Sequence, residues 1–205
     1  MSEILRPDLA AIAAMIPDTA RVLDIGCGDG MLLEHLVQDK KVDGRGLELI
    51  QQNVNACVAR GLAVIQGDAD TDLIDYPSGV FDFVILSQTI QATHNPRAVL
   101  EHLLRIGSHV AISLPNFGHW RVRLDILWRG RMPQTRLLHH HWYDTPNIHL
   151  CTIADFVDLV GVVGAEVEKA YAVDSKGRAH AMRAESWGPN LFDEGAVFLL
   201  HKKSS

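Results

Sequence analysis

Glycines and carboxylates are closely spaced in one short stretch of this chain, residues 24–30, which reads D-I-G-C-G-D-G. It follows an apolar run and precedes apolar residues at helical spacing, so we predict a buried strand, a glycine turn and a helix. Glycine permits backbone conformations that let a ligand lie directly against the chain. The residues expected to line such a site are Asp24, Gly26, Cys27 and Gly28.

The carboxylates in this stretch restrict the kind of ligand that the turn accepts. The dinucleotide fingerprint has the form G-x-G-x-x-G and places a pyrophosphate at the helix N-terminus. Here Gly30 follows Gly28 after a single residue, and Asp24 and Asp29 would repel a diphosphate. The same carboxylates suit a cationic ligand that carries an amine. The alternative is a glycine-rich turn that binds nothing.

Five further residues lie at or directly after the ends of predicted strands, where ligands bind in open α/β sheets. Glu48 ends the second strand about 20 residues after the glycine turn, which is the place of a carboxylate that binds ribose hydroxyls. Leu49 follows it directly. Asp68 and Ala69 follow the third strand, and Ser87 follows the fourth. We expect all five residues to lie at the same edge of the sheet.

Apolar runs separated by helical patterns predict an α/β, doubly wound fold with a seven-stranded, mostly parallel sheet. The predicted strands cover residues 22–25, 44–49, 62–66, 81–86, 110–114, 166–173 and 196–201. The predicted helices cover residues 5–16, 31–37, 51–60, 95–104 and 155–163. A length of 205 residues fits one domain, so we expect a single domain over residues 1–205. We interpret residues 175–190 as a polar loop.

Residues 116–150, after the fifth strand, are too long for a simple connection and form a predicted insertion. It contains four aromatic residues, Trp120, Trp128, Trp142 and Tyr143, among four arginines, Arg121, Arg123, Arg129 and Arg131. Aromatic residues and arginine are enriched at binding hot spots. We therefore interpret the insertion as a protein-docking surface or as a lid over the ligand site.

Composition argues against several classes of protein. The net charge of −6 and the pI near 6.0 disfavour a nucleic-acid partner, which needs a basic stripe. Three cysteines without a C-x-x-C pair indicate reduced thiols in a cytoplasmic protein rather than a disulfide framework or a zinc ribbon. No apolar stretch reaches membrane length. The histidine tract 139–141 has no Cys or Glu at zinc spacing, so we expect no metal site.

Residues 24–30 and four longer motifs resemble known families. The form D-x-G-C-G-x-G resembles motif I of the class I S-adenosylmethionine (SAM)-dependent methyltransferases. The longer motifs are L-S-Q-T-I-Q-A-T at 86–93, P-N-F-G-H-W-R-V-R-L at 115–124, G-R-M-P at 130–133 and W-Y-D-T-P-N-I-H-L-C-T at 142–152. Together they resemble the MetW family of methionine biosynthesis proteins.

This resemblance implies a class I methyltransferase (Rossmann-like) fold whose last strand runs antiparallel, with SAM or S-adenosylhomocysteine as the cofactor. It also implies that Glu48 binds the ribose hydroxyls and that Asp68 binds the adenine amino group. The role known for the family is that of a partner of homoserine O-acyltransferase (MetX), which implies a regulatory or activating subunit. The partner-docking candidates are Trp120, Arg121, Arg123, Trp128, Trp142 and Tyr143.

The alternative is a genuine small-molecule methyltransferase. Methyl transfer needs alignment of the nucleophile, the methyl group and the sulfur, with a general base for a hydroxyl or protonated amine. The candidate bases are His94, His119 and His149, each of which alone is more often structural or exposed. The lack of a base constellation favours the partner hypothesis, and catalytic residues stay unassigned. A homo-oligomer also stays open.

Overall fold

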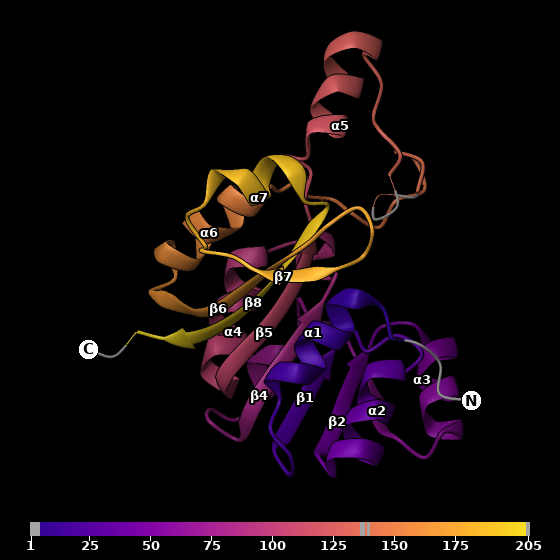
Figure 1. Cartoon of the computed structure of the whole chain (residues 1–205). Helices are drawn as coiled ribbons and strands as arrows, with labels where there is room; N and C mark the ends of the chain where they lie inside the picture. The colour runs from indigo at the N-terminus through magenta and orange to yellow at the C-terminus, as the bar shows by residue number, and fades with distance from the viewer. Residues whose placement is uncertain (1–4, 136–137, 139, 204–205) are drawn as a thin grey trace.

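One twisted sheet of eight strands runs through the molecule in the order β3-β2-β1-β4-β5-β8-β6-β7 (Figure 1). The computed structural model describes residues 5–135, 138 and 140–203. The strands are β1 (Arg21–Ile25), β2 (Asp43–Glu48), β3 (Ala63–Gln66), β4 (Phe81–Ser87), β5 (Gly107–Pro115), β6 (Ala165–Val173), β7 (Ala179–Ala181) and β8 (Gly195–Lys202). β1 to β5 are parallel, whereas β8 runs antiparallel to both β5 and β6. This is the expected doubly wound fold, and the antiparallel last strand is confirmed.

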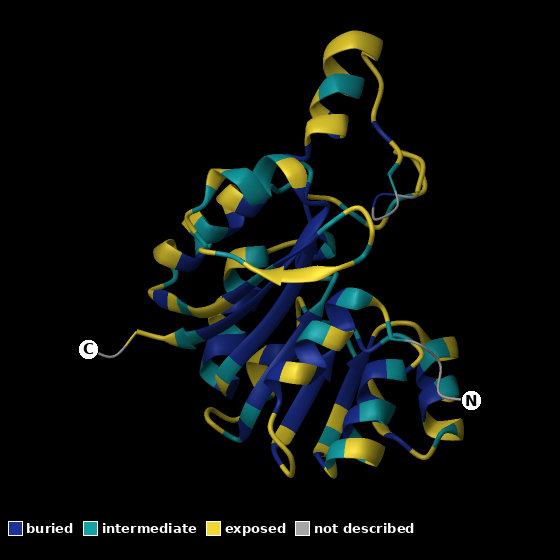
Figure 2. Ribbon diagram, viewed as in Figure 1, coloured by how far each residue is buried: buried dark blue, intermediate teal, exposed yellow. Residues whose placement is uncertain are grey.

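Helices cover both faces of this sheet (Figures 1 and 2). They are α1 (Pro7–Met15), α2 (Met31–Lys40), α3 (Gln51–Ala59), α4 (Pro96–Ile106), α5 (Trp120–Leu124), α6 (Ile153–Val162) and α7 (Trp187–Phe192). Phe83 and Ile85 of β4 pack in the cluster that contains α1 and α2, whereas Val84 and Leu86 pack in the cluster that contains α4 and α6. β4 is therefore buried on both faces, which explains its continuous apolar sequence. None of the helices in the described residues is long and apolar enough to cross a membrane.

The prediction of seven strands was wrong by one. The additional strand, β7, lies in the segment 175–190 that we predicted as a loop, and α7 begins in the same segment. All three residues of β7 are exposed, and the strand pairs only with β6 at the edge of the sheet. α7 has the sequence W-G-P-N-L-F and buries none of its residues. Neither element has a buried face, so neither leaves a hydrophobic period in the sequence.

Residues 116–150 leave the sheet after β5, and we call this segment the arm. It begins with α5 and continues into a π-helical turn, η3 (Asp125–Arg129), both of which project beyond the body of the molecule (Figure 1). Most residues of this projection are exposed (Figure 2). The chain then returns to the sheet, where Ile148 and His149 donate backbone hydrogen bonds to the carbonyl oxygen of Gln91, after β4.

The side chain of Asn116 holds the base of the arm against α7. Its amide nitrogen donates to the carbonyl oxygens of Asn190 and Asp193, both at 2.9 Å. Its amide oxygen accepts from the backbone nitrogen atoms of Gly118 at 2.8 Å and Ile153 at 3.4 Å. Because Asn116 is only 2% exposed, these bonds fix the start of the arm in a water-poor environment.

Candidate cofactor-binding site

The pairing of β1 with its two neighbours brings the ends of three strands together. Ile25 lies opposite Leu47 of β2 and opposite Leu86 of β4. The next residues along each strand are Gly26, Glu48 and Ser87. The structure thus brings the glycine turn, Glu48 and Ser87 to the same edge of the sheet, the edge at which ligands bind in this class of fold.

The glycine turn is built from residues in left-handed conformations. Gly26, Gly28 and Gly30 have φ angles of +67°, +58° and +84°. A Cβ atom on Gly26 would lie 2.8 Å from the hydroxyl oxygen of Thr89, so only glycine fits there. A Cβ atom on Gly28 would meet no heavy atom of the described residues within 4 Å. The turn is closed on the side of Thr89 and open above Gly28, where a ligand has room.

Glu48 ties the end of β2 to this turn. Its side chain is almost completely buried, and Oε2 accepts a hydrogen bond from the backbone nitrogen of Gly28 at 2.8 Å. Oε1 accepts from the backbone nitrogen of Ile50 at 2.9 Å. Oε1 also accepts from Nδ2 of Asn53 at 3.4 Å. Since each ionised carboxylate oxygen accepts about two hydrogen bonds, the remaining acceptor capacity for a hydroxyl group lies on Oε2.

Asp24 differs from Glu48 because its buried carboxylate lacks hydrogen-bond donors in the part of the chain that the structure describes. The residue is 2% exposed, and its Oδ1 atom has no hydrogen-bond partner among the described residues. Burial, together with the negative charge of Glu48, raises the pKa of Asp24 to about 7, against the opposing effect of Arg6. A buried carboxylate without partners is costly. A ligand ammonium group would supply the missing donor and counter-charge, so the residues present fit SAM.

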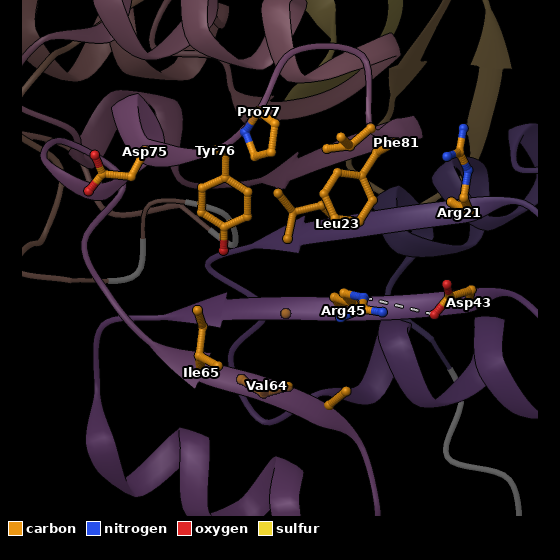
Figure 3. Close-up of a pocket in the computed structure, with 13 residues that line it drawn as sticks. Arg21, Leu23, Asp43, Arg45, Val64, Ile65, Asp75, Tyr76, Pro77 and Phe81 are labelled. Carbon is orange, nitrogen blue, oxygen red and sulfur yellow. Dashed lines mark ion pairs between the residues drawn. The ribbon is translucent and has the colours of Figure 1, made fainter.

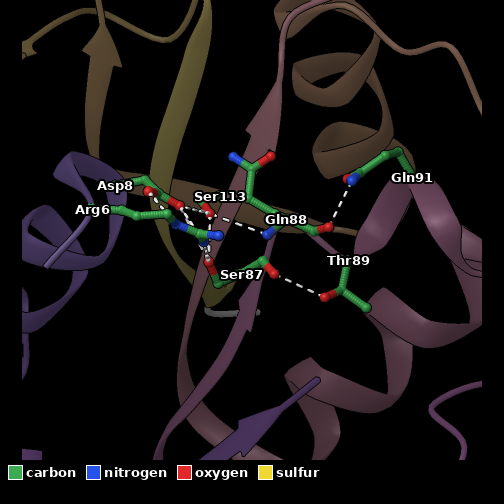
Figure 4. A network of polar contacts seen from close by, with 7 residues as sticks. All are labelled: Arg6, Asp8, Ser87, Gln88, Thr89, Gln91 and Ser113. Carbon is green, nitrogen blue, oxygen red and sulfur yellow. Dashed lines mark hydrogen bonds and ion pairs between the residues drawn. The ribbon is translucent and has the colours of Figure 1, made fainter. Parts of the chain in front are cut away.

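A polar network beside the end of β4 was missed by the sequence analysis (Figure 4). Oδ2 of Asp8, in the first turn of α1, accepts from Arg6 Nη2 at 3.1 Å, from Ser87 Oγ at 3.3 Å and from Ser113 Oγ at 3.0 Å. Gln88 follows Ser87 with a φ angle of +53°, which is strained for a residue other than glycine. Its backbone nitrogen donates to the carbonyl oxygen of Ser113 at 2.9 Å. The network anchors α1 over the ends of β4 and β5.

The remaining predicted cofactor residues lie beside this edge in differing environments. Leu49 is 60% exposed directly after Glu48, an unusual position for a large apolar side chain. Asp68 and Ala69 are half-buried at the exit of β3. Cys27 is buried in the glycine turn, and burial raises the pKa of its thiol, so it is no thiolate at neutral pH.

The three candidate bases occupy different surroundings. His119 is 2% exposed at the base of the arm, where Nδ1 accepts from the backbone nitrogen of Arg121 at 3.3 Å and caps α5. Burial lowers its pKa, so it is a neutral structural group. His94 and His149 are exposed. The backbone of His94 bonds to the carboxylate of Asp70, and that of His149 bonds to Gln91, so both border the loop after β4.

A cavity of about 730 Å³ lies elsewhere, on the face of the sheet over β1 to β3 (Figure 3). The chain between β3 and β4 forms only a 3-10 turn, η1 (Asp72–Asp75), so no helix covers this face. The lining residues Arg21, Asp43 and Phe81 are the first residues of their strands. The lining also includes Ile65 near the end of β3, so the cavity runs along the face of the sheet. Asp24, Gly26, Gly28 and Glu48 are not among its lining residues, and we do not assign the cofactor to it.

Metal-binding side chains do not gather in the described part of the chain. No group of three or more His, Cys, Asp or Glu residues there is arranged to hold a metal ion. Of the histidine tract, His139 lies outside the described residues. The ring of His141 stacks on that of Tyr143, with centroids 5.1 Å apart.

Comparison with known proteins decides the family. The family described as "Methionine biosynthesis protein MetW" matches residues 6–200. The chain belongs to the MetW family. A relative from Rhodopirellula baltica, named bifunctional methionine biosynthesis protein MetXA/MetW, is 33% identical over 211 residues. That match covers 98% of this chain but only 33% of the relative, so the chain spans about a third of the relative's length.

Solved structures similar to this MetW-family chain show the same fold. A SAM-dependent methyltransferase from Thermotoga maritima, described as a possible histamine N-methyltransferase, has a TM-score of 0.70 at 19% identity, covering 96% of this chain and 88% of that one. Magnesium protoporphyrin IX methyltransferase from Synechocystis PCC 6803 was solved with bound S-adenosylhomocysteine. It has a TM-score of 0.64 at 15% identity, and the match covers 95% of this chain and 82% of that one. The fold is therefore that of the class I SAM-dependent methyltransferases.

Proposed function

We propose that this MetW-family chain binds SAM or S-adenosylhomocysteine at the glycine turn and acts in the cytoplasm as a partner of homoserine O-acyltransferase (MetX). The observation that carries the cofactor assignment is the buried carboxylate of Asp24, whose Oδ1 has no partner among the described residues. It lies on the strand that leads into an open glycine turn, and a protein of the same fold was solved with bound S-adenosylhomocysteine. An amine-bearing ligand without phosphate matches this charge pattern.

Different residues of the chain bind different groups of the proposed cofactor. Asp24 takes the amino group, and Gly26 and Gly28 allow close approach of the ligand. Glu48 takes the ribose hydroxyls with its remaining acceptor capacity. The residues proposed for the remaining contacts are Cys27, Leu49, Asp68, Ala69 and Ser87. When bound, SAM supplies an activated methyl group.

The partner assignment rests on the family and on the arm. The relative from Rhodopirellula baltica carries MetXA and MetW in one protein, which supports an association of the two. The arm exposes Trp128 to 76% and Trp142 to 72%, and Tyr143 to 64%. Exposed aromatic side chains next to arginines are typical of hot spots. The proposed docking residues are Trp120, Arg121, Arg123, Trp128, Trp142 and Tyr143.

The second candidate function is methyl transfer to a small molecule. It is favoured by the position of His94 and His149, which border the loop that follows Ser87. Either imidazole would serve as a general base if an acceptor bound above that loop. His119 no longer belongs to this set, because its ring caps α5 at the base of the arm.

Turnover distinguishes the two functions. The chain is incubated with SAM, with and without the acyltransferase and homoserine, while S-adenosylhomocysteine formation and homoserine acylation are both followed. The partner function predicts a chain–acyltransferase complex and altered acylation, without methyl transfer. Repeated turnover of SAM in the absence of the acyltransferase would instead establish a methyltransferase.

A further inference from the structure

The tryptophans of this chain lie at one end of the molecule. The chain has four, three in the arm and one at the start of α7, which lies on α6 at the end of the body from which the arm projects (Figure 1). Their exposed fractions are 39% for Trp120, 76% for Trp128, 72% for Trp142 and 74% for Trp187. Tryptophan is highly buried on average in folded proteins. Three of the four are at least 72% exposed, which makes these side chains candidates for contact with another molecule.

Trp187 belongs to a second aromatic group, which our sequence analysis did not consider. Its ring lies 6.3 Å from that of Phe192, measured between centroids, and the two planes are tilted by 55°. Phe192 is 57% exposed. Because α7 buries none of its residues, this aromatic pair contributes little to the core. It is available for contact with a partner.

The Trp187–Phe192 pair is held rigidly beside the base of the arm. Asn116 bonds to the carbonyl oxygens of Asn190 and Asp193, which lie within and directly after α7. The side chain of Asn190 in turn accepts from the backbone nitrogen of Ala154, at 3.3 Å, in α6. These bonds join α7, the arm and α6 into one unit. Preorganisation of this kind reduces the entropy lost on binding.

The sheet order separates α7 from the strand that carries the glycine turn. α7 leads into β8, which is separated from β1 by β4 and β5. Neighbouring strands are about 4.8 Å apart, so β8 lies roughly 14 Å from β1. A substitution in α7 therefore changes none of the residues proposed to hold the cofactor, and the measurement of ligand binding shows whether α7 acts on that site.

We infer that the Trp187–Phe192 pair and the arm together form the surface that docks homoserine O-acyltransferase, an inference that rests on the proposed function. The relative that carries MetXA and MetW in one protein argues for this occupant. The charges of the arm argue against a second copy of the chain. Residues 116–150 contain five arginines and two aspartates, so the arm is basic and two arms placed against each other would repel. A partner face with acidic residues around an apolar recess fits this surface.

The test uses the full-length chain and the acyltransferase of the same organism. Association is measured by calorimetry for the wild type, for Trp187→Ala and for Phe192→Ala. Ile74→Ala is the matched control, since Ile74 is 67% exposed on η1, on the open face of the sheet. Binding of S-adenosylhomocysteine is measured for every variant. We expect association about 10-fold or more weaker for Trp187→Ala and for Phe192→Ala, unchanged for Ile74→Ala, and ligand binding within about twofold of wild type throughout.

The outcomes separate this inference from the function on which it rests. If the wild type binds the acyltransferase and both α7 variants bind it equally well, α7 is not part of the docking surface and the inference fails alone. If the wild type does not bind the acyltransferase, the proposed partnership fails and the inference falls with it. Loss of ligand binding in Trp187→Ala would also overturn the inference, because it would show that α7 acts on the cofactor crevice.

Discussion

At the scale of single residues, two buried carboxylates of the glycine turn have different roles. Glu48 already accepts hydrogen bonds from Gly28 and Ile50, so it shapes the turn before any ligand arrives. Asp24 has an oxygen without a partner and a pKa raised to about 7 by burial. The structure therefore predicts that Glu48 sets the geometry of the site and that Asp24 makes binding depend on pH.

Glu48→Ala is expected to weaken binding of S-adenosylhomocysteine about 10- to 100-fold, because charge-assisted hydrogen bonds contribute roughly 1.5–3 kcal/mol each. Calorimetric titration measures the effect. Glu48→Gln keeps the shape of the side chain and should give a smaller loss. Asp75→Ala, which removes an exposed carboxylate on η1, is the control and should bind as the wild type does. Unchanged affinity in Glu48→Ala would remove Glu48 from the site.

Affinity for S-adenosylhomocysteine is expected to rise with pH through the range around 7. Below this range Asp24 is protonated in the free protein, and the ligand ammonium must displace a proton; above it the carboxylate is already ionised. The gain between about pH 6 and 8 should approach 10-fold, since one pKa unit corresponds to a factor of 10. Titrations at several pH values measure it. Asp24→Asn should bind weakly and lose this slope, and an unaltered slope in that variant would exclude Asp24 as its source.

At the scale of elements, side-chain hydrogen bonds join the base of the arm to two helices. Asn116 connects the end of β5 to α7 and to the start of α6. Arg123 adds a bond from its guanidinium to the carbonyl oxygen of Gly118. The arm is therefore fixed where it begins, while its aromatic residues project into solvent farther along.

Asn116→Ala is expected to lower the free energy of unfolding by about 2–3 kcal/mol, because it leaves buried backbone groups without partners. Chemical denaturation measures the change. Asn55→Ala is the control, since Asn55 is exposed on α3 and bonds only within that helix through Gln51; it should change stability by less than about 0.5 kcal/mol. Equal stability of the two variants would show that the Asn116 network does not hold the arm.

Trp128→Ala separates the docking and lid interpretations of the arm. Truncation of an anchoring aromatic residue typically costs about 2–4 kcal/mol of association, so acyltransferase binding should weaken while ligand affinity stays unchanged. Arg123→Ala should likewise weaken acyltransferase binding and leave ligand affinity unchanged. It should also lower the stability of the fold, because Arg123 bonds to Gly118. Association and S-adenosylhomocysteine binding are measured for each variant. Intact association with reduced ligand affinity would establish the lid.

At the scale of the whole molecule, local sequence patterns predicted the sheet edge at the glycine turn better than its surroundings. The first five strands, the glycine turn and the position of Glu48 at the end of β2 were predictable because each depends on neighbouring residues or on the fixed spacing of a strand–turn–helix unit. The network of Asp8 was not, since its partners Ser87 and Ser113 lie 79 and 105 positions away in the chain. β7 and α7 were missed because they bury no side chains.

The direct test of the account is a calorimetric titration of S-adenosylhomocysteine into the wild-type chain at about pH 8, where Asp24 is ionised. We predict saturable binding of one ligand per chain, which is weakened by Glu48→Ala and unaffected by Asp75→Ala. Absence of binding at ligand concentrations up to about 1 mM, equivalent to less than roughly 4 kcal/mol of binding free energy, would contradict the central claim that this MetW-family fold holds the cofactor at its glycine turn.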